Sequence, residues 1–121
     1  MDGILLIDKP EGANSHHVVV RFRWAFGIDT IGHGGTLDPL ATGVLVILFG
    51  RAVKLSEYIT GHDKAYRVVG VLGEMRDTFD AQGRVTATDP RVVTPAEMER
   101  AVAEFPRAYD QMPPAYSAKK L

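Results

Sequence analysis

The sequence contains no cysteine, and this absence excludes both a disulfide framework and a metal site built from thiolates. It also lacks a surplus of positive charge, because 14 Lys and Arg residues are balanced by 15 Asp and Glu residues and the formal net charge is -1. Nucleic-acid-binding proteins usually carry a basic surplus that neutralises phosphates. Any RNA-binding surface of this chain is therefore expected to be a local patch.

Long hydrophobic runs are absent as well. The longest run, residues 44–49, is far too short to cross a bilayer. Met1 is followed by neither the basic segment nor the cleavage site of a secretory signal. We therefore expect a soluble, cytoplasmic protein with no membrane contact. The composition, 45% hydrophobic and 24% charged, is that of a folded domain, and 121 residues suit one domain at most.

Several motifs that would identify a common chemistry are missing. The four histidines include no H-E-x-x-H pair, so no zinc site is expected. No G-x-S-x-G motif of a hydrolase is present, and no glycine-rich stretch is followed by the lysine and hydroxyl of a phosphate-binding loop. Residues 77–83 match only part of a calcium-loop pattern, so a structural turn is the favoured interpretation there.

The pattern of apolar residues predicts strands and helices that do not alternate strictly. A helix is expected from Ser15, as its N-cap, to Gly27, with Trp24 packed against a sheet. Thr94 begins a capping box, and the helix after it is expected to direct its apolar side chains inward. Strands are predicted at residues 3–7, 44–49, 65–72 and 84–87, the second of them buried on both faces, and a short helix at 54–60.

These elements predict an α+β domain with a mixed, largely antiparallel sheet flanked by helices. The final segment, residues 111–121, is rich in proline and is expected to be extended. It contains no terminating signal, so we expect the domain to be incomplete at its C-terminus.

The most unusual segment is the glycine- and proline-marked loop at residues 31–43. Its glycines allow the backbone to approach a ligand closely. Asp38 lies in this loop immediately before Pro39, which disfavours helical geometry at Asp38. The loop therefore presents a carboxylate on a constrained backbone just before a buried strand, as a catalytic group requires. The alternative is that Asp38 only accepts backbone N–H groups in an Asx turn.

Four separated stretches of the chain resemble the bacterial tRNA pseudouridine-55 synthase family, known as TruB. In the family's order, they are residues 3–12 with Ser15, residues 32–45, residues 64–83 and residues 113–118. Two positions depart from the pattern. Gly34 stands where the family usually has threonine or serine, and is expected to loosen the loop, and Arg76 stands where threonine is usual.

The resemblance implies a pseudouridine synthase-like catalytic domain, with residues 1–121 as its N-terminal portion and its C-terminal half and RNA-binding domain absent. It also implies that the enzyme isomerises a specific uridine in the T-loop of tRNA after base flipping. Uracil is detached from C1′ of its ribose, turned, and rejoined through C5. The reaction needs neither a cofactor nor a metal. The expected partner is the tRNA T stem-loop, and the protein is expected to be a monomer.

The site residues follow from the same resemblance. Asp38 matches the catalytic aspartate, which acts as an anion by attacking a carbon or by abstracting a ribose proton. Tyr66 resembles the tyrosine that stacks on the target base, and His33 resembles a histidine that helps displace the target nucleotide. Lys9 and Pro10 match a turn that supports the substrate site, and Arg67 is a candidate phosphate contact.

Each of these residues also has a structural interpretation. Tyr66 can be a tyrosine of a sheet core, His33 a hydrogen-bonded loop histidine, and Arg67 a solvated surface charge. For the whole chain, the alternative function is a catalytically incompetent module that binds or folds tRNA. A third hypothesis, a guide-RNA-dependent relative, shares the aspartate loop, but the continuation at residues 40–43 favours the bacterial family.

Overall fold

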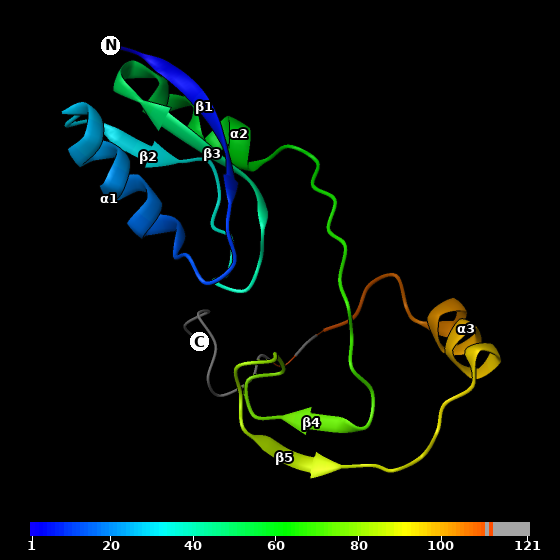
Figure 1. The fold of residues 1–121 in the computed structure, drawn as a ribbon. Coiled ribbons are helices and arrows are strands. Elements are labelled where there is room, and N and C mark those ends of the chain that lie inside the picture. The colour runs from blue at the N-terminus through cyan, green and yellow to red at the C-terminus, as the bar shows by residue number, and fades with distance from the viewer. Residues whose placement is uncertain (111, 113–121) are drawn as a thin grey trace. The chain divides into compact units, whose positions relative to one another are not determined.

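The computed structural model describes residues 1–110 and 112, and it divides the chain into two compact units, Met1–Tyr66 and Arg67–Leu121 (Figure 1). The described parts combine helices with antiparallel sheets. The α+β class predicted from the sequence is therefore confirmed. The predicted extended segment at residues 111–121 lies outside the described residues, except for Met112.

The first unit is built on a three-stranded sheet with the order β1-β3-β2. Strand β3 lies in the centre and pairs antiparallel with both neighbours, so that Lys9 lies opposite Gly43 and His33 opposite Ile47. The elements follow the chain as β1 (Gly3–Lys9), α1 (Ser15–Phe26), β2 (Ile31–His33), β3 (Gly43–Phe49), the 3-10 helix η1 (Gly50–Leu55) and α2 (Ser56–Thr60). The sequence did not predict β2, because its three residues begin the glycine-rich segment 31–43 that was interpreted as a loop.

Both faces of β3 are covered, as its continuous apolar run predicts. On one face Leu45 and Ile47 pack with Val19 of α1 and Ile31 of β2 to form the hydrophobic core. Leu48 points to the opposite face because side chains alternate along a strand, and it is also fully buried. The covered stretch does not include the whole strand, since Val44 at its start is exposed.

Helix α1 has a different N-cap from the one predicted. Asn14, not Ser15, has the extended backbone of an N-cap, and its side chain accepts a hydrogen bond from the His16 N–H at 2.8 Å. Gly27 ends the helix in the left-handed conformation, as expected. The prediction for Trp24 was wrong, because its side chain is 82% exposed. Phe22 packs against the core. Trp24 comes two residues later, and side chains two residues apart lie on nearly opposite faces of a helix, so Trp24 points away from the core.

The second unit contains a hairpin of β4 (Glu74–Arg76) and β5 (Val85–Thr88), followed by α3 (Pro95–Glu104). Its loop is tied internally: the Arg76 guanidinium donates to the carbonyls of Ala81 and Gly83, and Asp77 accepts from the Arg84 N–H at 2.9 Å. The turn favoured at residues 77–83 is thus formed. Thr94 and Glu97 form the predicted capping box of α3.

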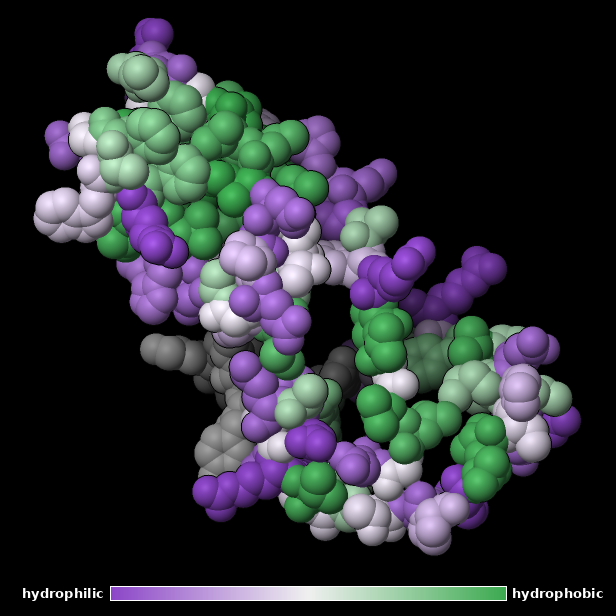
Figure 2. Space-filling view, in the orientation of Figure 1, coloured by the Kyte–Doolittle hydropathy of each residue, from purple (hydrophilic) through white to green (hydrophobic). Residues whose placement is uncertain are grey.

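Two predictions for the second unit were wrong. Residues 67–72 form no strand and are exposed, because no other strand of the described residues pairs with them. Met98 and Val102 of α3, and Phe105 directly after it, were expected to point inward but are exposed as well. The space-filling view shows apolar residues at the surface of the first unit as well as the second (Figure 2).

Candidate active site

Asp38 lies in the connection between β2 and β3, and its side chain is exposed. Its own carbonyl accepts a hydrogen bond from the Ala41 N–H at 3.0 Å, which closes a tight turn through Pro39 and Leu40. The carboxylate itself makes no hydrogen bond or ion pair with any described residue. Asp38 therefore does not close an Asx turn, and that alternative was wrong. Its carboxylate is available to a substrate.

The residue before Asp38 is held by the start of α1. The Ser15 hydroxyl oxygen accepts a hydrogen bond from the Leu37 N–H at 3.0 Å and donates one to the Leu37 carbonyl at 2.9 Å. Ser15 is buried, and these bonds join residues that are 22 positions apart. A single hydroxyl group thus satisfies both backbone groups of Leu37.

The residue after Asp38 is held by the turn between β1 and α1. The Pro39 carbonyl accepts a hydrogen bond from the Gly12 N–H at 2.7 Å and a second from the Lys9 ammonium at 3.2 Å. The same ammonium donates to the carbonyls of Pro10 at 3.1 Å and Ala13 at 2.7 Å. Asp38 is therefore flanked on both sides by backbone that is fixed to residues 9–15.

Lys9 is fully buried, and burial of an ammonium is tolerated only when hydrogen bonds replace its lost hydration. Three carbonyls supply those bonds here. This geometry fits the supporting role that the family resemblance implies for Lys9. Direct contact of Lys9 or Pro10 with substrate stays a prediction, although the Pro10 side chain is exposed.

His33 is the last residue of β2, on the other side of the same loop. It is half-buried, and its Nδ1 atom is buried without a hydrogen-bond partner among the described residues. Together with Thr36, Glu57 and Thr60, it lines a shallow depression of about 660 Å³. The His33 Nδ1 atom therefore makes none of the hydrogen bonds that the structural interpretation expects of a loop histidine.

Gly34 was expected to loosen the loop, and its surroundings show the opposite. Its N–H donates to the Val46 carbonyl at 2.9 Å, and its carbonyl accepts from the Thr60 hydroxyl at 3.2 Å. A Cβ atom added at Gly34 would lie 2.7 Å from Cγ2 of Ile59. The glycine thus allows α2 to pack directly onto the loop, and a larger residue would need a different contact at Ile59.

Tyr66 and Arg67 lie outside regular secondary structure, since the strand predicted around them is not formed. The Tyr66 side chain is 64% exposed, so it is not the sheet-core tyrosine of the structural interpretation. Arg67 is exposed and pairs with no carboxylate among the described residues. Their contacts with RNA stay predictions.

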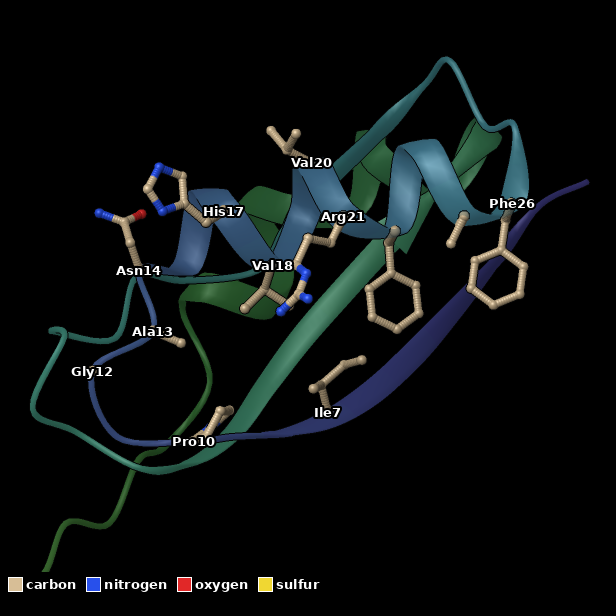
Figure 3. A pocket seen from close by; sticks show the side chains of 12 residues that line it. Ile7, Pro10, Gly12, Ala13, Asn14, His17, Val18, Val20, Arg21 and Phe26 are labelled. Atoms are coloured by element: carbon tan, nitrogen blue, oxygen red, sulfur yellow. The ribbon is translucent and has the colours of Figure 1, made fainter.

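A second depression, of about 740 Å³, lies between α1 and β1 (Figure 3). Apolar side chains such as Ile7, Val18 and Phe22 line it, with His17 and Arg21 as polar members. Asp38 lines neither this groove nor the depression beside His33.

Sequence reasoning found Asp38 and the turn that supports it, but it missed two of the groups that hold the loop. From the sequence, Gly12 is only the last residue of the family-like stretch 3–12, and Ser15 is the expected N-cap of the helix. The adjacent Asn14 and Ser15 are both good N-caps, and this doublet is the signal that one of the two side chains is free for another contact.

Within residues 1–110 and 112, no three His, Asp or Glu side chains gather in a way that could hold a metal ion. The helices in this part of the chain are also too short or too polar for a membrane span.

Comparisons with known proteins place these features in a family. A family model described as TruB family pseudouridylate synthase (N terminal domain) matches residues 23–121. The chain is also similar to proteins named tRNA pseudouridine synthase B. It is 46% identical to that of Syntrophotalea carbinolica, 45% to that of Opitutus terrae and 43% to that of Stutzerimonas stutzeri.

These alignments cover 99%, 100% and 99% of this chain, but 40%, 51% and 39% of the respective relatives. The chain thus spans about half or less of the length of the curated relatives it matches. Since the family model matches most of the chain and the relatives match nearly all of it, the resemblance is confirmed: the chain belongs to the TruB family of pseudouridylate synthases.

Proposed function

We propose that the protein converts a specific uridine in the T-loop of tRNA into pseudouridine, with Asp38 as the catalytic carboxylate. One observation carries this proposal. Asp38 is exposed and unpaired among the described residues, while hydrogen bonds fix the backbone of the residues on either side of it. A carboxylate held in this way can meet a substrate without first breaking a bond within the protein.

The chemistry fits a lone carboxylate. An aspartate side chain in water is already an anion at neutral pH, so it needs no neighbouring base to activate it. As an anion it can attack a carbon of the nucleoside or remove a proton from the ribose. Both routes end with the uracil bonded through C5, and neither transfers electrons to another molecule, so no redox cofactor is called for.

The substrate class is supported by the relatives, which are named tRNA pseudouridine synthase B. To reach Asp38, the target uridine must leave its stacked position in the RNA, at a cost of a few kcal/mol. Stacking on an aromatic ring returns about 1–3 kcal/mol per base. Tyr66 has the exposed ring that such stacking needs, and we assign it this role, with His33 displacing the nucleotide and Arg67 contacting a phosphate.

The matched family model is that of an N-terminal domain. This supports the prediction that residues 1–121 are the N-terminal portion of the catalytic domain. We propose no metal and no cofactor for the reaction.

The test uses a T stem-loop RNA that carries tritium at C5 of its uridines. Formation of the new bond at C5 releases the tritium into water, so release measures isomerisation. The full-length protein is expected to release tritium, and Asp38→Asn is expected to abolish release while tRNA binding is retained. Asp29→Asn is the matched control, because it makes the same charge change at an exposed aspartate at the opposite end of the sheet.

The alternative function, a module that binds or folds tRNA without catalysis, predicts a different result. Binding would then be salt-sensitive, no tritium would be released, and Asp38→Asn would behave like Asp29→Asn. That result would overturn the proposal.

A further inference from the structure

The Ser15 side chain makes two of the bonds that hold the catalytic loop. It is 2% exposed, and its hydroxyl oxygen lies 3.0 Å from the Leu37 nitrogen and 2.9 Å from the Leu37 oxygen. A hydroxyl group can accept and donate at the same time. Alanine can do neither, so its introduction would leave the Leu37 N–H and carbonyl without these partners.

Ser15 is free to bind the loop because its neighbour caps the helix. Asn14 accepts the His16 N–H at 2.8 Å, and its backbone carbonyl accepts the Val18 N–H at 3.2 Å. Ser15 is the first residue of α1 and takes no part in this capping. The two adjacent side chains therefore have separate roles: Asn14 caps the start of the helix, and Ser15 binds the backbone of Leu37.

We infer that Ser15 is a positioning residue that sets the place of Asp38 through the backbone of Leu37. The inference rests on the proposed function of Asp38. The Asp38 carboxylate has no partner of its own within the described residues, so its location depends on the backbone on either side. Gly12 and Lys9 hold the Pro39 side. Among the described residues, Ser15 is the one that supplies side-chain hydrogen bonds to Leu37.

This arrangement predicts an effect on the chemical step rather than on tRNA affinity. Loss of the Ser15 oxygen lets the Leu37 peptide move, and Asp38 moves with it. A displacement of about 1 Å at a reacting group costs on the order of 100-fold in rate. Binding of tRNA is spread over many contacts, so KM is expected to change little.

The experiment compares Ser15→Ala with Asn14→Ala in the full-length protein. Both variants replace a polar residue at the start of α1, but only the first removes the bonds to Leu37. Tritium release from a C5-labelled T stem-loop gives kcat and KM, and thermal unfolding shows whether each variant is folded. Hydrogen exchange of the Leu37 amide reports the contact independently of activity.

For Ser15→Ala, we expect kcat to fall about 10- to 100-fold with KM nearly unchanged, and the Leu37 amide to exchange faster. For Asn14→Ala, we expect a lower unfolding temperature, unchanged kcat and unchanged exchange at Leu37. Equal kcat values for the two variants would overturn the positioning role, and so would a loss that tracks the unfolded fraction. A wild-type protein that binds tRNA but releases no tritium would overturn the proposed function itself, whatever Leu37 shows.

Discussion

The two units of the chain differ in how their structure is held together. In Met1–Tyr66, apolar residues distant in sequence pack into a core, and side chains 22 and 30 positions away hold the backbone on either side of Asp38. From Arg67 onward, the described apolar side chains are exposed, although the hairpin and the capping box are formed. Local signals thus suffice for turns and caps, whereas a rigid site needs contacts between distant parts of the sequence.

The largest expected effect tests where the core lies. Ile47 is 0% exposed, whereas Val69 is 86% exposed. We expect Ile47→Ala to lower the free energy of unfolding by about 2–5 kcal/mol, because it removes buried methyl groups and leaves a cavity. Val69→Ala is expected to change it by less than about 0.5 kcal/mol. Urea unfolding measures both values.

The two alanine variants are controls for one another, since each shortens a β-branched side chain. If Val69→Ala proved as costly as Ile47→Ala, the second unit would contain a core of its own and the contrast between the units would be lost.

A smaller effect is expected at Gly34, where Ile59 of α2 packs against the loop. Gly34→Ala would place its Cβ 2.7 Å from Cγ2 of Ile59 and 3.4 Å from Cβ of Val46. The β-branched side chain of Ile59 has few rotamers in a helix and cannot easily move aside. We expect a loss of about 1–3 kcal/mol in the free energy of unfolding, as in other overpacked sites.

Ile59→Ala removes the clashing methyl group and serves as the partner in a double-mutant cycle. The combined Gly34→Ala, Ile59→Ala variant should be more stable than the sum of the two single effects implies. Strict additivity would mean that α2 does not pack onto the loop at Gly34.

The smallest expected effect is the loss of stability of α3 at acidic pH. Hydrogen bonds from the Thr94 side chain and backbone hold the pKa of Glu97 below its usual range. A lowered pKa means that the ionised carboxylate stabilises the folded helix. This contribution is fully present above the pKa of an unfolded glutamate and is lost as the pH falls through the folded value. NMR titration should therefore show Glu97 ionising below an unfolded reference, and Thr94→Ala should move it upward.

A Glu97 that titrates at the unfolded value in the wild type would mean that the capping box does not form in solution. The hairpin of β4 and β5 would then be the remaining local structure among the described residues of the second unit.

The sequence predicted those features that neighbouring residues determine. The apolar run at 44–49, the glycine that ends α1 and the capping box at Thr94 each depend on a few adjacent positions, and each is found. Asp38 was singled out because glycines and a proline surround it, whereas the proposal that it is catalytic rests on the family resemblance.

The remaining features depend on partners that a local pattern does not reveal. The alternation in residues 65–72 shows that a strand is possible, but strand stability depends on pairing and burial. No strand in the described part of the chain pairs with those residues. Likewise, the Asn14 and Ser15 pair shows that one side chain can cap the helix. Which of them reaches Leu37 is decided by the position of a loop 22 residues away.

The most direct test of the catalytic role of Asp38 is a single-turnover measurement of tritium release, with the protein in excess over a C5-labelled T stem-loop RNA. Saturation removes differences in binding, so the rate constant reports the chemical step. Asp38→Asn is expected to lower this rate constant by at least about 1,000-fold, while Asp29→Asn leaves it unchanged. An Asp38→Asn protein that releases tritium at the wild-type rate would contradict the account.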